Sequence, residues 1–350
     1  MSAKITIEGR EIGADRPVYV VAEMSANHHH SLDRAVEIVE AAAAAGADAI
    51  KLQTYTPDTI TIDCDNEHFR VGEGTLWEGR TLHDLYAEAY TPWEWHPRLK
   101  EVAEGLGLHC FSSPFDGSAV EFLEQLGVPA YKLASFEIVD LGLIRAAAAT
   151  GKPLILSTGM ATRNEIDEAV RTAREAKAAG IALLKCTSAY PSPPEAMNLR
   201  TIPDMARELG VPVGLSDHTM GVAVPVAAVA LGACIVEKHF TLSRDDRGPD
   251  SAFSLEPAEF RTMVEAIRTT ERSLGDVRYA PGEHEAASRA FRRSLFVVRD
   301  VKAGERFSSD SVRSIRPGSG LAPRELERVL GRRASRDIPR GTPLSWDLVE

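Results

Sequence analysis

Two histidines, His218 and His239, each stand just beyond a short apolar run of strand length, residues 212–215 and 234–236. Side chains alternate between the two faces of a strand, so Glu237 and His239 share one face. If the two strands are neighbours, both imidazoles end at the same level. Such a pair can bind a divalent metal and leave positions open for water and substrate. A single histidine at a strand end is more often a core residue, so the metal hypothesis depends on the pair and on Glu237.

Three lysines, Lys51, Lys132 and Lys185, lie near the ends of three other apolar runs. A buried ammonium without a partner is costly, so several converging lysines need anions. Serine hydroxyls near the same ends add donors that suit a phosphate and a carboxylate. These serines are Ser112, Ser113, Ser135, Ser157 and Ser216.

The lysines have two alternative uses. They could form structural ion pairs with carboxylates, for which Glu23, Glu137 and Glu237 are the candidates. Lys132 or Lys185 could instead form a Schiff base with a carbonyl substrate, as in class I aldolases. The residues alone leave both alternatives open.

Eight apolar runs position these side chains, and each run ends on residues that can do chemistry. Eight strands with polar carboxyl-terminal ends predict a (β/α)8 TIM barrel whose active site is the ring of strand ends. In a closed ring the first and last strands are neighbours, which would bring Glu23 beside Glu237. The runs are residues 17–22, 47–50, 108–111, 130–131, 153–156, 181–184, 212–215 and 234–236.

Stretches with helical spacing of apolar residues alternate with these runs. The first begins after Ser31, a suitable N-cap, and ends at Gly46. Alternating strands and helices predict parallel strands with right-handed crossovers, which agrees with the barrel. The predicted helices are residues 31–45, 93–106, 117–126, 141–150, 163–179, 202–209, 221–231 and 257–274.

One connection, residues 55–91, is too long for an ordinary loop and shows no sustained period. Long insertions after a barrel strand often form part of a binding site. Trp77 could therefore cover the barrel mouth, or it could be a packed residue of a surface loop. Both interpretations stay open at this stage.

The chain changes character after Gly275. We expect a catalytic barrel over residues 1–275, a polar linker over 276–290 and a small β-rich domain over 291–350. A domain of about 60 residues has a limited core of its own. We therefore expect this domain to pack against another surface, either its own barrel or that of a partner.

Composition excludes several classes of function. The chain has 350 residues, a formal net charge of −11, 44 % hydrophobic and 26 % charged residues, which is typical of a globular enzyme. The acidic charge argues against nucleic acid or an anionic membrane as the main partner.

No signal-peptide-like or membrane-spanning apolar run is present, so we expect a cytoplasmic protein. The four cysteines lack CxxC spacing and read as reduced, mostly buried thiols. Walker, GxGxxG and GxSxG motifs are missing.

The strand-end motifs, taken together and in order, resemble the sialic acid synthase family. Those enzymes condense phosphoenolpyruvate with an amino-sugar aldehyde, and they end in an antifreeze-like (SAF, β-clip) domain, which the tail with Ile315-Arg316-Pro317-Gly318 resembles. The resemblance spans nearly the whole chain. The matching motifs are Ala22-Glu23-Met24-Ser25-Ala26-Asn27-His28, Lys51-Leu52-Gln53-Thr54, Phe111-Ser112-Ser113-Pro114-Phe115, Tyr131-Lys132-Leu133-Ala134-Ser135, Leu156-Ser157-Thr158-Gly159-Met160, Gly214-Leu215-Ser216-Asp217-His218 and Glu237-Lys238-His239-Phe240.

Within that family, the chain most resembles the branch that makes pseudaminic acid. Leu76-Trp77 and the stretches 25–28, 53–58 and 91–96 look like that branch. After Cys186-Thr187 the N-acetylneuraminate branch carries Asn, whereas this chain has Ser188, followed by Tyr190. We expect Ser188 to contact substrate.

The resemblance implies a divalent ion at His218 and His239, Mn²⁺ first and Mg²⁺ or Co²⁺ as options. It implies that C3 of phosphoenolpyruvate attacks the sugar aldehyde, and that phosphate leaves by C–O cleavage. Glu23 would lie near C2 of the condensing centre, and Glu237 near metal-bound water or the new hydroxyl. The phosphate and carboxylate would be held by Lys51, Lys132, Ser113, Ser135, Ser157 and Ser216.

The resemblance also implies the sugar site. Gln53, Tyr190 and Asp250 would contact the sugar, and Arg316 of the tail would reach an N-acyl group, from the partner subunit of a domain-swapped homodimer. An N-acetylneuraminate or legionaminic acid synthase with the same mechanism is the near alternative. A Schiff-base aldolase on the same barrel and a non-catalytic carbohydrate-binding protein are the remote ones.

Overall fold

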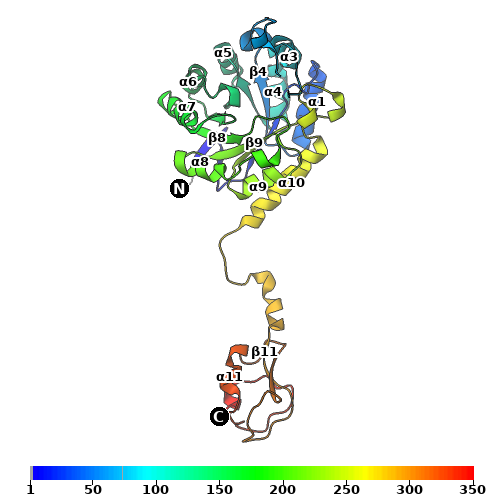
Figure 1. Cartoon of the computed structure of the whole chain (residues 1–350), viewed down its shortest axis with the longest axis vertical. Helices are drawn as coiled ribbons and strands as arrows, with labels where there is room; N and C mark the ends of the chain where they lie inside the picture. The colour runs from blue at the N-terminus through cyan, green and yellow to red at the C-terminus, as the bar shows by residue number, and fades with distance from the viewer. Residues whose placement is uncertain (1–2, 73) are drawn as a thin grey trace. The chain divides into compact units, whose positions relative to one another are not determined.

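The computed structural model describes residues 3–72 and 74–350. It divides the chain into two compact units, Met1–Gly275 and Asp276–Glu350, which we describe separately (Figure 1). No helix within the described residues has both the length and the apolar composition needed to cross a membrane.

The first unit is a closed barrel of eight parallel strands in the order β10-β3-β4-β5-β6-β7-β8-β9, which confirms the predicted TIM barrel. Each predicted run forms one strand, and most strands extend further into the polar residues than the apolar runs did. The strands are β3 (Tyr19–Glu23), β4 (Ala49–Thr54), β5 (His109–Pro114), β6 (Tyr131–Leu133), β7 (Leu154–Ser157), β8 (Ile181–Cys186), β9 (Val213–Asp217) and β10 (Ile235–His239).

Helices cover the outside of this barrel, and all eight predicted helices are confirmed with ends that shift by a few residues. Two further helices lie in the long insertion. The helices are α1 (Leu32–Ala44), α2 (Pro57–Ile60), α3 (Leu82–Ala89), α4 (His96–Gly105), α5 (Gly117–Leu126), α6 (Leu141–Ala149), α7 (Arg163–Glu175), α8 (Thr201–Leu209), α9 (Ala223–Ala230) and α10 (Pro257–Leu274).

Local side-chain contacts explain where several helices begin and end. The hydroxyl of Ser31 accepts from the Arg34 N–H at the start of α1, as expected. Thr162 and Glu165 form a capping box at the start of α7. Gly127 ends α5 with φ +72°, a left-handed conformation that costs glycine little.

An N-terminal hairpin of β1 (Lys4–Ile7) and β2 (Arg10–Gly13) was not predicted. Its side chains Ile5, Ile7 and Ile12 are buried in one cluster with Tyr19 and Ile235, which begin their barrel strands. The hairpin therefore closes the amino-terminal end of the barrel. The active site is left to the opposite end.

The second unit has a small core and one antiparallel pair, β11 (Ser294–Val297) with β12 (Val312–Ile315), and one short helix, α11 (Leu326–Val329). Leu295, Phe307 and Leu344 belong to its buried cluster. Residues 276–290, predicted as a linker, are mostly exposed and include a 3₁₀ turn at Glu283–Glu285.

Candidate active site

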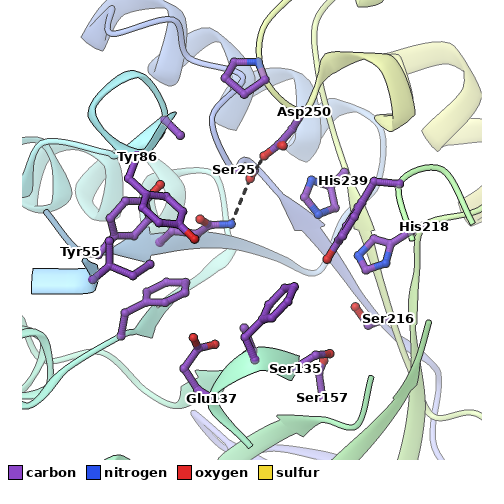
Figure 2. A pocket seen from close by; sticks show the side chains of 18 of the residues that line it. Ser25, Tyr55, Tyr86, Ser135, Glu137, Ser157, Ser216, His218, His239 and Asp250 are labelled. Atoms are coloured by element: carbon purple, nitrogen blue, oxygen red, sulfur yellow. Dashed lines mark hydrogen bonds between the residues drawn. The ribbon is translucent and has the colours of Figure 1, made fainter. Parts of the chain in front are cut away.

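A cavity of about 500 Å³ is lined by residues at the carboxyl-terminal ends of the barrel strands (Figure 2). Most of the predicted site residues line it, although they come from six strands and the loops that follow them. The predicted residues in its lining are Lys51, Gln53, Lys132, Ser135, Ser157, Tyr190, Ser216, His218, Glu237, His239 and Asp250.

Strand register brings the predicted catalytic groups together. β10 pairs with β9 on one side and with β3 on the other, placing Glu237 opposite Ser216 and His239 opposite Glu23. His218 follows directly after β9. The prediction that the carboxylates of Glu23 and Glu237 lie on neighbouring strands of the ring is therefore confirmed.

Two lysines and two glutamates form a buried charge network in the inner part of the site. Lys51 pairs with Glu23, and its Nζ lies 3.7 Å from Oε1 of Glu237. Lys132 Nζ is 3.8 Å from the same oxygen. Lys51 also donates to Ser113 Oγ at 3.3 Å. Structural pairing and anion binding are thus not exclusive, because the same ammonium groups face the cavity.

Burial and neighbouring charges move the pKa values of the two carboxyl groups apart. Burial raises the pKa of Glu23 to about 7, although Lys51 opposes the rise. Glu237 is equally buried, but Lys132 and Lys51 hold its pKa below the ordinary value. One carboxyl group is therefore poised to exchange a proton near neutral pH while the other stays ionised.

His218 and His239 present an arrangement that fits a metal ion. Their ring centroids are 5.3 Å apart. Nδ1 of His218 donates to the Thr187 carbonyl at 2.9 Å, which leaves Nε2 as the free lone pair. Burial lowers the pKa of His239 well below its usual value, and its Nδ1 is buried without a hydrogen-bond partner within the described residues. His239 is therefore a neutral imidazole that suits a divalent ion. Burial opposes the charging of His218, but contact with Cys186 raises its pKa, so His218 would give up a proton when it binds a metal. Residues 3–72 and 74–350 contain no cluster of three or more His, Cys, Asp or Glu residues that could bind one. An ion held by His218 and His239 would keep positions open for water and substrate.

A second hydrogen-bonded group lies beside the histidines. Gln53 Nε2 donates to Glu23 and to Ser25, each at 3.0 Å, and the Ser25 hydroxyl donates to Asp250 (Figure 2). The Tyr190 ring packs on His218 with a centroid distance of 4.4 Å. The three residues that the resemblance implied as sugar contacts thus line the same cavity as the two histidines, and Tyr190 contacts His218 directly.

The serine hydroxyls of the site differ in how they are used. Ser135 Oγ accepts from the Gly159 N–H at 3.1 Å. Ser157 and Ser188 have buried hydroxyls for which the described part of the chain supplies no hydrogen-bond partner. Ser188 lies against Gly159 as well, because a Cβ built there would meet Ser188 Oγ. These unused donors are available for a ligand.

Two expectations about strand faces are wrong. Lys185 lies between Leu184, in the barrel interior, and Cys186, in the cavity lining, so it points to the opposite face; its Nζ donates to the Cys186 carbonyl at 2.6 Å. Ser112 is bonded to Thr54 Oγ1 at 2.6 Å on the outer face of β5. Neither belongs to the group of converging donors, and Lys185 is removed as a Schiff-base candidate.

Arg316 belongs to the second unit, where its side chain is exposed. Its proposed contact with the sugar stays a prediction.

Several residues of the site were missed by sequence reasoning. Cys186 was read as an inert core thiol, yet it lines the cavity with Sγ 3.9 Å from His218 Nδ1. Burial opposes its ionisation, but contact with His218 lowers its pKa to about 7. Phe253 packs on His239 at a centroid distance of 4.9 Å. The alternation along β8 was the available signal for Cys186; Phe253 follows β10 in a loop without a period.

Trp77 of the insertion lines the cavity, as one of its two interpretations expected. Its Nε1 donates to the Pro249 carbonyl at 2.9 Å, and its ring packs against Tyr190. The insertion is therefore part of the wall and not a detached surface loop.

The fold and site define a (β/α)8-barrel protein with a polar strand-end cavity and a separate small C-terminal domain. The NeuB family profile matches residues 38–279 and the SAF domain profile matches residues 292–350. The chain belongs to the NeuB family, as the strand-end motifs predicted.

Named relatives extend this result. Pseudaminic acid synthase of Campylobacter jejuni is 46% identical over 330 residues, or 94% of this chain and 96% of that one. N,N'-diacetyllegionaminic acid synthase of Legionella pneumophila is 36% identical over 97% of this chain and 96% of its own. The structure of N-acetylneuraminic acid synthetase from Leptospira borgpetersenii matches with a TM-score of 0.73 and 32% identity, over 82% of this chain and 95% of that one.

Proposed function

We propose that this chain is a pseudaminic acid synthase, a transferase that condenses phosphoenolpyruvate with 2,4-diacetamido-2,4,6-trideoxy-L-altrose and water to give pseudaminic acid and phosphate. The observation that carries the proposal is the set of groups that line one cavity. Lys51 and Lys132 converge there with Ser157, whose buried hydroxyl has no hydrogen-bond partner among the described residues, and with His218 and His239. The 46% identity to a pseudaminic acid synthase supports the choice of sugar.

Two groups of cavity residues, which we call the two arcs, would each bind one of the substrates. Lys51 and Lys132, with Ser113, Ser135, Ser157 and Ser216, would hold the phosphate and carboxylate of phosphoenolpyruvate through charge-assisted hydrogen bonds. Gln53, Tyr190 and Asp250, with Ser188 nearby, would hold the sugar. Both substrates would then lie within reach of one another without bulk water between them.

His218 and His239 would bind the divalent ion, with Mn²⁺ the first choice, and the ion when bound supplies Lewis-acid polarisation of an aldehyde. A new bond would form between C3 of phosphoenolpyruvate and the aldehyde carbon. The C=O π electrons move to the aldehyde oxygen, which takes a proton from solvent and becomes the new hydroxyl, and the positive charge at C2 is met by water. Glu23 would orient this water and take one of its protons. Its pKa, which burial raises to about 7, supports this role, because such a carboxyl group can accept a proton near neutral pH. The C2–O bond to phosphate then breaks, which leaves the keto acid and inorganic phosphate.

The decisive experiment measures phosphate release from phosphoenolpyruvate with each candidate sugar in the presence of Mn²⁺. We expect turnover with the altro-configured diacetamido sugar to exceed turnover with the legionaminic acid precursor and with N-acetylmannosamine. A preference for either of the other sugars would replace the proposed substrate, and turnover after complete chelation would overturn the metal assignment.

We also infer that the protein acts in the cytoplasm, where phosphoenolpyruvate is available, and that it forms a domain-swapped homodimer in which the SAF domain, residues 291–350, supplies Arg316 to its partner's site. The small core of that domain supports this assembly, since a small β-rich unit gains stability from packing on another surface.

A further inference from the structure

The cavity has a second, apolar end that the two arcs described above do not use. Five residues of the insertion and of its two helices line it, and we call this surface the insertion wall: Ile60, Val71, Leu82, Leu85 and Ala89. Tyr55 and Tyr86 lie on this side of the cavity, across from His218 and His239 (Figure 2). A ligand that carried only polar groups would not need an apolar surface of this kind.

Contacts on either side hold the insertion wall in place. Tyr55 packs edge-on against Tyr86 at a centroid distance of 5.7 Å and against Phe115 at 5.0 Å. Nε2 of His83 in α3 lies 3.0 Å from Asp58 in α2, which ties the two helices of the insertion together. These contacts connect the two helices of the insertion to each other and to the aromatic side chains beside the wall.

One carboxyl group faces the boundary between this wall and the polar arcs. Glu137 lies in the 3₁₀ turn η3 (Ser135–Glu137) and lines the cavity. Its Oε2 is buried, with neither a hydrogen bond nor an ion pair to any part of the chain that the structure describes. Tyr86 lines the same cavity; burial raises the pKa of Tyr86, and the charge of Glu137 raises it further.

We propose that the insertion wall and Glu137 form the specificity subsite for the C4–C6 end of the sugar. This inference rests on the proposed function and names the residues that would select its substrate. The methyl groups of a 6-deoxy sugar and of its 4-acetamido group would lie against Leu82 and its neighbours. The amide N–H of the acetamido group would donate to Glu137 Oε2.

The same surface would reject sugars with hydroxyl groups at these positions. A hydroxyl against the insertion wall loses its hydrogen bonds to water and finds no partner there. A sugar with a 4-hydroxyl in place of the acetamido group would place no methyl group against the insertion wall. It would also lack the amide N–H that donates to Glu137. Discrimination of this kind is worth about tenfold or more for each lost group.

The first test changes Leu82, which is only half-buried, to serine. We expect kcat/KM for the 6-deoxy diacetamido sugar to fall about tenfold, while KM for phosphoenolpyruvate is unchanged. The 6-hydroxy counterpart of the same sugar, measured as substrate or as competitive inhibitor, should lose much less. Ile62→Ser is the matched control, because Ile62 lies in the same insertion, is 57% exposed and is not among the lining residues.

The second test concerns Glu137. Glu137→Leu should lower kcat/KM for the 4-acetamido sugar about tenfold, whereas Glu137→Gln keeps an acceptor and should retain most of it. Thermal melting of each variant shows whether the fold is intact. If a folded Leu variant equals the wild type, or if Gln and Leu lose activity equally, Glu137 does not accept the amide.

The outcomes separate this inference from the proposed function. If the wild-type protein releases no phosphate with any diacetamido sugar, the proposed function is wrong. If it turns over the 6-deoxy sugar but Leu82→Ser affects the 6-deoxy and 6-hydroxy sugars equally, only the subsite is wrong.

Discussion

Asp217 and Lys238 form a fully buried ion pair, with 2.6 Å between Oδ2 and Nζ and no exposed surface on either side chain. They alternate with the inward-facing Ser216 and Glu237, so the pair lies on the outer face of β9 and β10. Asp217 also accepts from the Thr219 N–H at 2.9 Å. The pair therefore fixes the chain on both sides of His218.

Breaking this pair should destabilise the barrel strongly. Lys238→Met leaves the carboxylate of Asp217 buried without its charge partner, and we expect a loss of ~3–5 kcal/mol in the free energy of unfolding. Urea denaturation followed by circular dichroism measures this. The double variant Asp217→Leu/Lys238→Met removes both charges and should recover most of the loss; a double variant as unstable as the single one would contradict the explanation.

Metal binding should require both histidines of the site. Mn²⁺ titration followed by electron paramagnetic resonance should show tight binding to the wild-type protein and none to His218→Ala or His239→Ala. His68→Ala is the control, because the His68 side chain is 79% exposed in the insertion and does not line the cavity. Chelation should abolish phosphate release and Mn²⁺ should restore it. Equal Mn²⁺ binding by the wild type and all three variants would show that His218 and His239 do not bind the metal.

Lys132 should serve phosphoenolpyruvate and not a Schiff base. Lys132→Met removes a charge-assisted hydrogen bond, and we expect KM for phosphoenolpyruvate to rise roughly 10–100-fold, equivalent to ~1.5–3 kcal/mol. Borohydride treatment of the wild-type protein with pyruvate should leave Lys132 unmodified, as judged by peptide mass spectrometry. A reduced adduct on Lys132 would instead favour the aldolase alternative.

The fold was predictable from the sequence because one signal recurs eight times. Each apolar run that ends at a residue such as Glu23, Ser157 or His239 predicts three things at once: a strand, its burial, and a polar residue at its carboxyl-terminal end. The hairpin at residues 4–13 carried a signal too, since Ile5 and Ile7 alternate before a Glu-Gly turn, but it lies before the first barrel strand and repeats nowhere else.

The site was less predictable because the face of a side chain depends on register. Lys185 and Cys186 are adjacent, and the rule of alternation places only one of them in the cavity; the lysine was chosen for its charge, but Cys186 faces inward. Leu82 lies in a helix of the insertion, and Phe253 lies in the loop after β10. The spacing of apolar residues in the sequence does not predict that either side chain points to the barrel mouth. Their positions follow from packing between distant segments.

Glu137 should make stability depend on pH. Burial raises its pKa from 4.5 to about 7, so the folded state keeps a proton that the unfolded chain releases. Stability from this group is therefore fully present below its ordinary pKa and is lost as pH rises through the raised value. Glu137→Gln should match the wild type at pH 4.5 and be more stable at pH 8, by ~1–3 kcal/mol. Thermal melts at both pH values measure the difference, and an unchanged difference between them would contradict the burial of a neutral carboxyl group.

Arg316 should act on the site of a partner subunit. Arg316→Ala in the full chain should raise KM for the sugar, because an N-acyl group loses its donor, with KM for phosphoenolpyruvate unchanged. Arg313→Ala is the matched control, since Arg313 is exposed on the neighbouring part of β12.

Mixing subunits tests which chain supplies the arginine. In a swapped dimer of Arg316→Ala and His239→Ala chains, one barrel keeps its own His239 and receives Arg316 from the other chain. The assay uses a sugar concentration well below the raised KM of Arg316→Ala, at which both variants are nearly inactive. Co-refolding the two variants should then restore activity up to about a quarter of the wild-type level, because half of the dimers are mixed and each has one complete site. If each barrel used its own Arg316, no dimer would hold a complete site and the mixture would stay as inactive as its parts.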